Sequence, residues 1–201
     1  MSAKKLEFFF DFASPYSYIA SHQIEAVAEK HGTELVWQPF VLGGVFQAIG
    51  ANAPRDNKPK GEYLLQDLED LTALYGIPYK QRTEFIIRSI LPLRATLQIP
   101  QGQERARAVH ALYKGSWAED QDMSRAEVVE GLLTDAGFDG AALVEGTQQP
   151  AVKDELRKNT EDIVSRGGFG APTYFVDDSK MFWGHDRLDV LDRYLENMQT
   201  G

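Results

Sequence analysis

The 201-residue chain carries 21 basic and 30 acidic residues, a formal net charge of −9, and its 43% of hydrophobic residues is enough for an ordinary globular core. The acidic balance argues against nucleic acid and anionic membranes as partners, because both need clustered positive charge. The chain has no cysteine, which excludes disulfides, thiolate metal sites and redox chemistry of its own thiols.

The start of the chain does not have the pattern of a secretory signal. The apolar run after Lys4 and Lys5 is interrupted by Glu7 and Asp11, whereas a signal peptide has an uninterrupted apolar core. No apolar stretch approaches the roughly 20 residues that a membrane-spanning helix needs. We therefore expect the protein in the cytoplasm, or in an organelle matrix.

A βαβ unit is predicted at the beginning of the chain. Residues 6–12 form an aromatic run of strand length, residues 16–30 have helical periodicity, and residues 34–40 form a second strand. Two strands joined through a helix run parallel. Ser14-Pro15 stands where the helix begins, since proline suits a first helical turn and serine can cap its free N–H groups.

The middle of the chain is predicted to be helical. Residues 48–61 are rich in Gly, Pro, Asn and Lys, so an ordered loop with little regular structure is expected there. About a hundred residues of helical periodicity follow. The predicted helices cover residues 63–75, residues 83–97 with a kink or a new turn at Pro92, residues 103–117, a stretch from a capping box at Ser124–Glu127 to Gly137, residues 140–145, and residues 150–166.

Strand character returns at the end of the chain. Residues 171–178 and 181–183 are predicted strands joined by a turn, and a final helix follows residues 184–187. The order is βαβ, a block of helices, then ββα, without an internal repeat. We therefore expect one domain made of residues 1–62 and 168–201, with residues 63–167 as a helical insertion.

This order, together with three motifs, carries a family resemblance over almost the full chain. The motifs are Phe-Asp-Phe-Ala-Ser-Pro-Tyr-Ser-Tyr at residues 10–18, Gly-Ala-Pro-Thr at residues 170–173, and Phe-Trp-Gly-His-Asp-Arg at residues 182–187. The chain resembles the DsbA-like branch of the thioredoxin superfamily, which implies an α/β thioredoxin fold with an inserted all-helical domain. Because Ser14 stands where that branch has its first cysteine, the chain is most similar to kappa-class glutathione transferases and 2-hydroxychromene-2-carboxylate isomerases.

The resemblance implies glutathione as the cofactor, with its thiol beside Ser14. A hydroxyl at a helix N-terminus can donate a hydrogen bond to a thiolate and lower the thiol pKa, but Ser14 can equally be a plain helix cap. Pro172 corresponds to the cis proline of the thioredoxin fold, although it could be an ordinary proline at an edge strand. The backbone of Ala171 would then pair with the cysteinyl unit as an added strand does.

Two further residues are implied at the γ-glutamyl end of glutathione. Asp186 corresponds to an aspartate that binds this end in the resembling families, although from the local sequence it reads as a helix N-cap. His185 stands where kappa enzymes usually have serine, and it could equally be a surface residue. An ammonium group needs an acceptor, which the Asp186 carboxylate supplies.

The substrate side of the site is implied less directly. By the resemblance, Asn52 orients the substrate or thiol and Lys60 supplies positive charge for an anionic group, although Lys60 could be a solvated loop cation. The isomerases commonly carry asparagine where this chain has Arg88. The Arg88 guanidinium could pair with a substrate carboxylate or face solvent, and the same two alternatives hold for Arg94. Trp117, Trp183, Phe40 and Phe46 either wall an aromatic pocket or belong to the core.

Three functions remain open from the sequence. The first is a glutathione-dependent isomerase acting on 2-hydroxychromene-2-carboxylate or a related aromatic carboxylate of arene breakdown. The second is a kappa-like glutathione transferase that conjugates electrophiles, and the third is a non-catalytic thioredoxin-fold binding module. A dithiol oxidoreductase is excluded because the chain has no cysteine. Homodimers are usual among the resembling enzymes, so a homodimer is expected.

Overall fold

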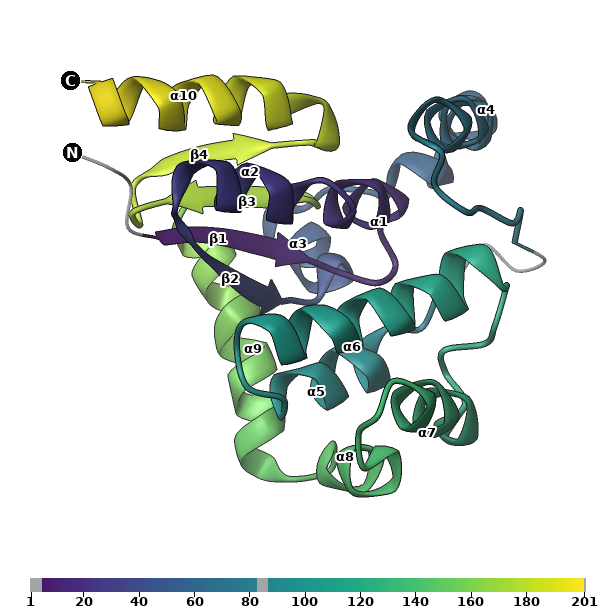
Figure 1. Cartoon of the computed structure of the whole chain (residues 1–201). Coiled ribbons are helices and arrows are strands. Elements are labelled where there is room, and N and C mark those ends of the chain that lie inside the picture. The colour runs from purple at the N-terminus through teal and green to yellow at the C-terminus, as the bar shows by residue number, and fades with distance from the viewer. Residues whose placement is uncertain (1–4, 83–86, 201) are drawn as a thin grey trace.

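A mixed sheet of four strands forms the centre of the computed structural model, which describes residues 5–82 and 87–200 (Figure 1). The strand order is β2-β1-β3-β4, with β1 (Lys5–Phe10) parallel to β2 (Glu34–Pro39) and antiparallel to β3 (Thr173–Val176). β4 (Lys180–Trp183) pairs antiparallel with β3. The predicted βαβ and ββα units therefore join into one sheet, as in the thioredoxin fold.

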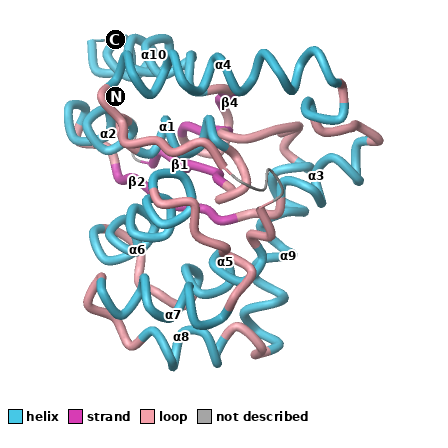
Figure 2. Tube along the Cα trace, turned by 90° about the vertical axis from the view of Figure 1, so that its right-hand side faces the viewer, coloured by secondary structure: helices cyan, strands magenta, loops and turns pink. Residues whose placement is uncertain are grey.

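Helices surround the sheet and extend away from it. α10 packs against α2 on one face, α9 crosses the other side beside α3, and α5 to α8 gather beyond β2 (Figures 1 and 2). Within the described part of the chain, none of the helices has both the length and the apolar composition that would let it cross a membrane. The helices are α1 (Pro15–Ser21), α2 (Ile24–His31), α3 (Leu42–Ile49), α4 (Lys58–Tyr75), α5 (Ile90–Leu97), α6 (Gln103–Tyr113), α7 (Ala126–Asp135), α8 (Gly140–Gly146), α9 (Pro150–Ser165) and α10 (Leu188–Thr200).

The aromatic run of β1 is buried on both faces of the sheet. Phe8 and Phe10 are both fully buried in the main core, where Phe8 lies 5.2 Å from the Trp37 ring and 5.5 Å from the Tyr174 ring. Phe9 points to the opposite face, into a smaller cluster below α3 and α9. A central strand covered on both sides needs a continuous apolar sequence, and each of these buried rings contributes about 1.5–3 kcal/mol.

The segment between β2 and α4 differs from the prediction. The expected loop at residues 48–61 is wrong in part, because α3 extends to Ile49 and α4 already begins at Lys58, where the Asn57 side chain caps it by accepting the Lys60 N–H at 3.3 Å. Gly43 and Gly44 both lie inside α3, which packs on α9. This contact between distant segments outweighs the low helix propensity of glycine.

Other helix ends also differ in detail. The predicted helix at residues 16–30 is two helices separated at residues 22–23, and the one at 103–117 ends as a π-helical turn, η2 (Lys114–Ala118). Residues 83–86 of the predicted helix at 83–97 lie outside the described residues, and α5 begins at Ile90, so Pro92 occupies a first turn as expected.

The predicted capping box at Ser124–Glu127 is wrong. The Ser124 hydroxyl and N–H both donate to the carboxylate of Asp122, at 2.7 and 2.9 Å, and the N-cap of α7 is Arg125, which makes no side-chain cap hydrogen bond. α7 begins only at Ala126, so Ser124 lies one residue before the N-cap, in a turn that its hydrogen bonds to Asp122 hold.

One carboxylate is buried where β1 ends. Asp11 is 1% exposed and accepts hydrogen bonds from the N–H groups of Ala13 at 2.9 Å and Leu42 at 2.7 Å, which joins the end of β1 to the start of α3. Burial raises the pKa of Asp11, although the hydrogen bonds from Ala13, Ser89 and Leu42 act in the opposite direction. Asp11 therefore connects three parts of the chain at an electrostatic cost.

Because burial raises the pKa of Asp11, the effect of Asp11→Asn on stability should depend on pH. Because the pKa of Asp11 is higher in the folded protein than its ordinary 3.8, its contribution to stability is fully present below pH ~4 and is lost as the pH rises through the folded pKa. The free energy of unfolding of the variant minus that of the parent protein should therefore increase as the pH rises from about 4. The increase is at most about 1.4 kcal/mol per pH unit. Urea unfolding across this range measures the difference, and a difference that does not change with pH would contradict the prediction.

Candidate functional site

A cavity of about 710 Å³ opens beside the start of α1. Its walls come from the start of α1, from α3, from residues 87–94 and from the loop at residues 169–171. This volume is within the range of pockets that hold small-molecule ligands and cofactors. The cavity therefore contains the predicted thiol position and is bounded by segments from both ends of the chain.

Ser14 lies on the wall of this cavity and also caps α1. Its side chain is buried, accepts the Ser17 N–H at 3.1 Å and donates to the Ala171 carbonyl oxygen at 3.2 Å. The structure thus shows the capping role, while the thiolate role stays a prediction. A hydroxyl has one proton, so donation to a ligand requires that it turn away from Ala171.

The loop before β3 brings Ala171 to Ser14 across 157 positions of sequence. The Ala171–Pro172 peptide bond is cis, as in the thioredoxin fold. A Cβ on Gly170 would lie 2.4 Å from the Trp183 indole nitrogen, so only glycine allows this loop to pack on Trp183. Tight packing at Gly170 fixes the position of the Ala171 carbonyl at the cavity wall.

Two arginines supply positive charge to the same cavity. Arg88 lies on its wall with an exposed side chain, just before α5, and Arg94 lies on α5 with a half-buried one. The Nε–H of Arg94 is buried and has no hydrogen-bond partner among the described residues. A guanidinium binds carboxylates well because its donors match their geometry. Of the predicted substrate residues, Arg88 is the one that the structure brings to the cavity.

The other two predicted substrate residues are not among those that line the cavity. Asn52 and Lys60 are both exposed, and Lys60 lies in the first turn of α4. Their neighbours Ala53 and Pro54 do line the cavity, so this segment borders the site. The roles of Asn52 and Lys60 stay predictions.

His185 packs in an aromatic pair at the side of the site. Its ring stacks on that of Tyr16 with 4.9 Å between centroids, and the Tyr16 hydroxyl donates to Asp67 at 2.7 Å. Burial lowers the pKa of His185, which keeps its imidazole neutral near pH 7. Burial and the hydrogen bond to Asp67 raise the pKa of Tyr16. The pair joins α1, α4 and the segment before α10.

Asp186 lies in a 3₁₀ turn, η3 (His185–Arg187), whose N-cap is Gly184. The local prediction that Asp186 is an N-cap is therefore wrong for this turn. Its carboxylate is more than half exposed and lies 3.3 Å from a nitrogen of Arg187. Gly184 has φ +103°, and a Cβ there would lie 2.4 Å from Asp186 Oδ1, so the carboxylate folds over this glycine. His185, Asp186 and Pro172 are not among the residues that line the cavity.

Two of the four aromatic residues predicted to wall a pocket do line the cavity. Trp183 and Phe46 line the cavity, whereas Trp117 and Phe40 are core residues. The Trp117 indole N–H donates to the Phe12 carbonyl oxygen at 2.9 Å and so holds the backbone just before Ser14.

Sequence reasoning missed several wall residues. Phe169, which packs at 4.8 Å from the Trp183 ring, and Thr147 and Gln148 are brought to the cavity by contacts between distant segments, and no local pattern marks them. Asp11 also lines the cavity, and the sequence contains a local pattern that could have identified it. A carboxylate inside an aromatic run is an anomaly that predicts a buried and hydrogen-bonded group.

Comparison with known proteins gives consistent results. The family model of the DsbA-like thioredoxin domain matches residues 5–196. A 2-hydroxychromene-2-carboxylate isomerase of Sphingobium xenophagum is 34% identical over 195 residues, which cover 96% of this chain and 98% of the relative. The glutathione S-transferase kappa 1 of Rattus norvegicus is 24% identical, with 92% and 88% covered. A solved structure of a 2-hydroxychromene-2-carboxylate isomerase superposes with a TM-score of 0.87 at 27% identity, over 96% of this chain and 95% of that one.

The family match and the level of identity support the resemblance seen in the motifs. They agree with the sheet order, the cis proline and the place of Ser14. The chain belongs to the DsbA-like thioredoxin family, and within it to the family of the 2-hydroxychromene-2-carboxylate isomerases.

Proposed function

We propose that this protein is a glutathione-dependent isomerase that acts in the cytoplasm on 2-hydroxychromene-2-carboxylate or a related aromatic carboxylate. The observation that carries the proposal is the meeting of the Ser14 hydroxyl and the Ala171 carbonyl on one cavity wall, in a chain without cysteine. The identity of 34% to an isomerase of that name supports it.

The described residues fit glutathione by their chemistry. The Ala171 carbonyl would accept a hydrogen bond from an N–H of the cysteinyl unit, and the Ser14 hydroxyl would donate one to the thiolate. The exposed carboxylate of Asp186 suits the γ-glutamyl ammonium group, next to the neutral ring of His185. The volume of about 710 Å³ leaves room for a small aromatic substrate as well.

When bound, glutathione supplies a thiolate that adds reversibly to the conjugated substrate, so that a double bond becomes a single bond until elimination restores it. The residues of the chain stabilise charge and orient the reactants. The Ser14 hydroxyl donates a hydrogen bond to the sulfur, which favours the thiolate over the thiol. Arg88 holds the substrate carboxylate. Trp183 and Phe46 cover the aromatic ring, while Asn52 and Lys60 act from the border of the site.

The second candidate is a kappa-like glutathione transferase. The similarity to the rat kappa enzyme favours it, as does Arg88, which stands where isomerases commonly carry asparagine. A transferase uses the same thiolate but releases the conjugate. The third candidate, a binding module, predicts glutathione binding without turnover. A homodimer is proposed for the active protein, and residues 63–167 are proposed as the inserted domain.

A spectral assay with 2-hydroxychromene-2-carboxylate decides between these candidates. We expect isomerisation only when glutathione is added, with the total amount of free glutathione unchanged at the end. Glutathione consumed in proportion to product would instead identify a transferase. If neither the chromene nor a panel of electrophiles reacts, although calorimetry shows glutathione binding, the protein is a binding module and the isomerase proposal is wrong.

The variant Ser14→Ala tests the thiolate role. Loss of a hydrogen bond to a charged sulfur should raise the pKa of bound glutathione by about 1 unit or more, because such bonds contribute about 1.5–3 kcal/mol. The ultraviolet absorbance of the thiolate, followed against pH, measures this value. The lost cap should separately cost about 1 kcal/mol of stability. An unchanged thiol pKa in the folded variant would leave Ser14 with the capping role alone.

The variant Asp186→Ala tests the γ-glutamyl contact. We expect glutathione binding to weaken about ten-fold, as for the loss of one charge-assisted hydrogen bond. Calorimetric titration measures it, with Asp189→Ala as the matched control, since Asp189 is an exposed aspartate three residues further along the chain. Equal affinities of the two variants would remove Asp186 from the site.

A further inference from the structure

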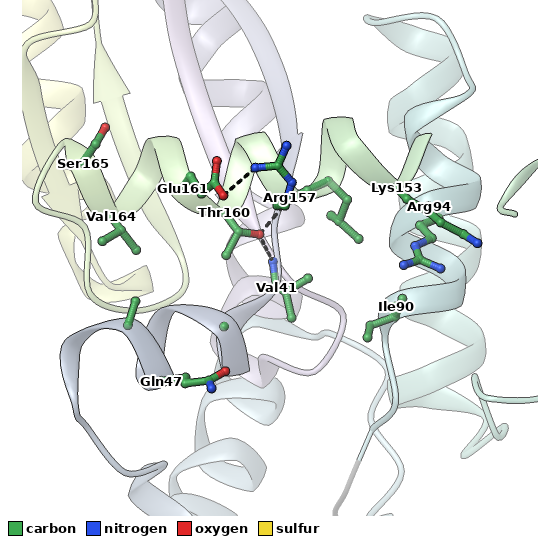
Figure 3. Close-up of a pocket in the computed structure, with 13 residues that line it drawn as sticks. Val41, Gln47, Ile90, Arg94, Lys153, Arg157, Thr160, Glu161, Val164 and Ser165 are labelled. Carbon is green, nitrogen blue, oxygen red and sulfur yellow. Dashed lines mark hydrogen bonds and ion pairs between the residues drawn. The ribbon is translucent and has the colours of Figure 1, made fainter. Parts of the chain in front are cut away.

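A second cavity of about 580 Å³ lies between α3, α5 and α9 (Figure 3). It shares Val41, Ile90 and Arg94 with the cavity of Ser14, and its remaining lining residues belong to α3 and α9. The reaction proposed above uses none of the residues that belong to the second cavity alone. Its chemistry therefore needs a separate explanation.

Apolar atoms form most of the surface of the lining. Val41, Leu156 and Val164 are at least partly buried along it, while Ile90 is 47% exposed although it is a large aliphatic residue. Figure 3 shows Val41 and Ile90 among the side chains of this lining. Such a lining favours a ligand with an apolar body, because contact removes this surface from water.

The charged residues of the lining are mostly cationic. Arg157 is neutralised, since it lies 2.7 Å from Glu161 and 3.7 Å from Asp154. Arg94 and Lys153 make no ion pair among the described residues, although both side chains are half-buried. Two unneutralised cations beside an apolar surface, in a chain of net charge −9, mark a place where a small anion is favoured.

The buried Nε–H of Arg94 is an independent sign of a missing acceptor. It has no partner in the described part of the chain, whereas buried donors in native proteins are nearly always hydrogen-bonded. A carboxylate accepts from guanidinium and ammonium groups alike. A phosphate would satisfy the charge but would leave the apolar lining without a partner.

We propose that the second cavity binds a small amphipathic carboxylate. The acidic group lies between Arg94 and Lys153, and a flat apolar body lies against Val41, Ile90 and Leu156. The proposal does not depend on the glutathione reaction, because Lys153 and the α9 residues are not part of the cavity of Ser14.

Calorimetric titration of the full chain with 2-naphthoate tests the proposal, and the neutral 2-naphthamide serves as the comparison ligand. Lys153→Ala should weaken naphthoate binding about five-fold, as for loss of one partly exposed ion pair. Ala48→Trp should abolish it, since Ala48 is an exposed residue of α3 whose enlargement fills this cavity alone. The matched control is Lys158→Ala, because Lys158 is an exposed lysine of α9 that lines neither cavity.

Each outcome is informative, provided that circular dichroism shows that the variants are folded. Weaker binding by Lys153→Ala, loss by Ala48→Trp and no change by Lys158→Ala support the site. If Arg88→Ala removes naphthoate binding while Lys153→Ala and Ala48→Trp leave it unchanged, naphthoate binds in the cavity of Ser14. That result would overturn the proposal. Equal binding of the amide, or no naphthoate binding at all, would overturn it as well.

Discussion

The hydrogen bonds of one buried residue, Asp11, hold the site together. Its carboxylate accepts from Ala13 and Leu42, and its backbone carbonyl accepts from the Ser14 N–H at 2.9 Å and the Tyr113 hydroxyl at 3.1 Å. The end of β1, the start of α1, the start of α3 and the end of α6 thus meet at one residue. Apolar packing cannot fix direction in this way, because it has no preferred geometry, whereas hydrogen bonds do.

The loop before β3 and the turn before α10 are held by packing at two glycines. Gly170 lies against the Trp183 indole, and Gly184, at φ +103°, lies below the Asp186 carboxylate. Gly170 packs on Trp183, the last residue of β4, and Gly184 follows it, so the end of one short strand positions the Ala171 carbonyl and the Asp186 carboxylate. The site is therefore built from two rigid parts that Ser14 and Ala171 connect. Such preorganisation lowers the entropy cost of binding a flexible ligand.

The sequence predicted those features whose cause is local or carried by a motif. The run at residues 6–12 marked the central strand because both its faces are buried, and the motifs marked Ser14, Ala171 and Pro172. The loop expected at residues 48–61 was wrong in part because α3 extends to Ile49 and packs on α9, a helix more than a hundred residues away along the chain. Phe169 and Gln148 could not be found for the same reason, since only the folded chain brings them to the cavity.

The net charge of −9 and the arginines of the site are compatible because electrostatic interactions in salt are short-ranged. At physiological ionic strength the Debye length is about 8 Å, so an anion in either cavity responds to its immediate neighbours and hardly to the acidic surface beyond. Arg94 lies on the wall of both cavities. An anion paired with Arg94 in one cavity would reduce the attraction for an anion in the other, and because linkage is reciprocal, two such anions would weaken each other equally. The shared arginine makes the two cavities one electrostatic unit.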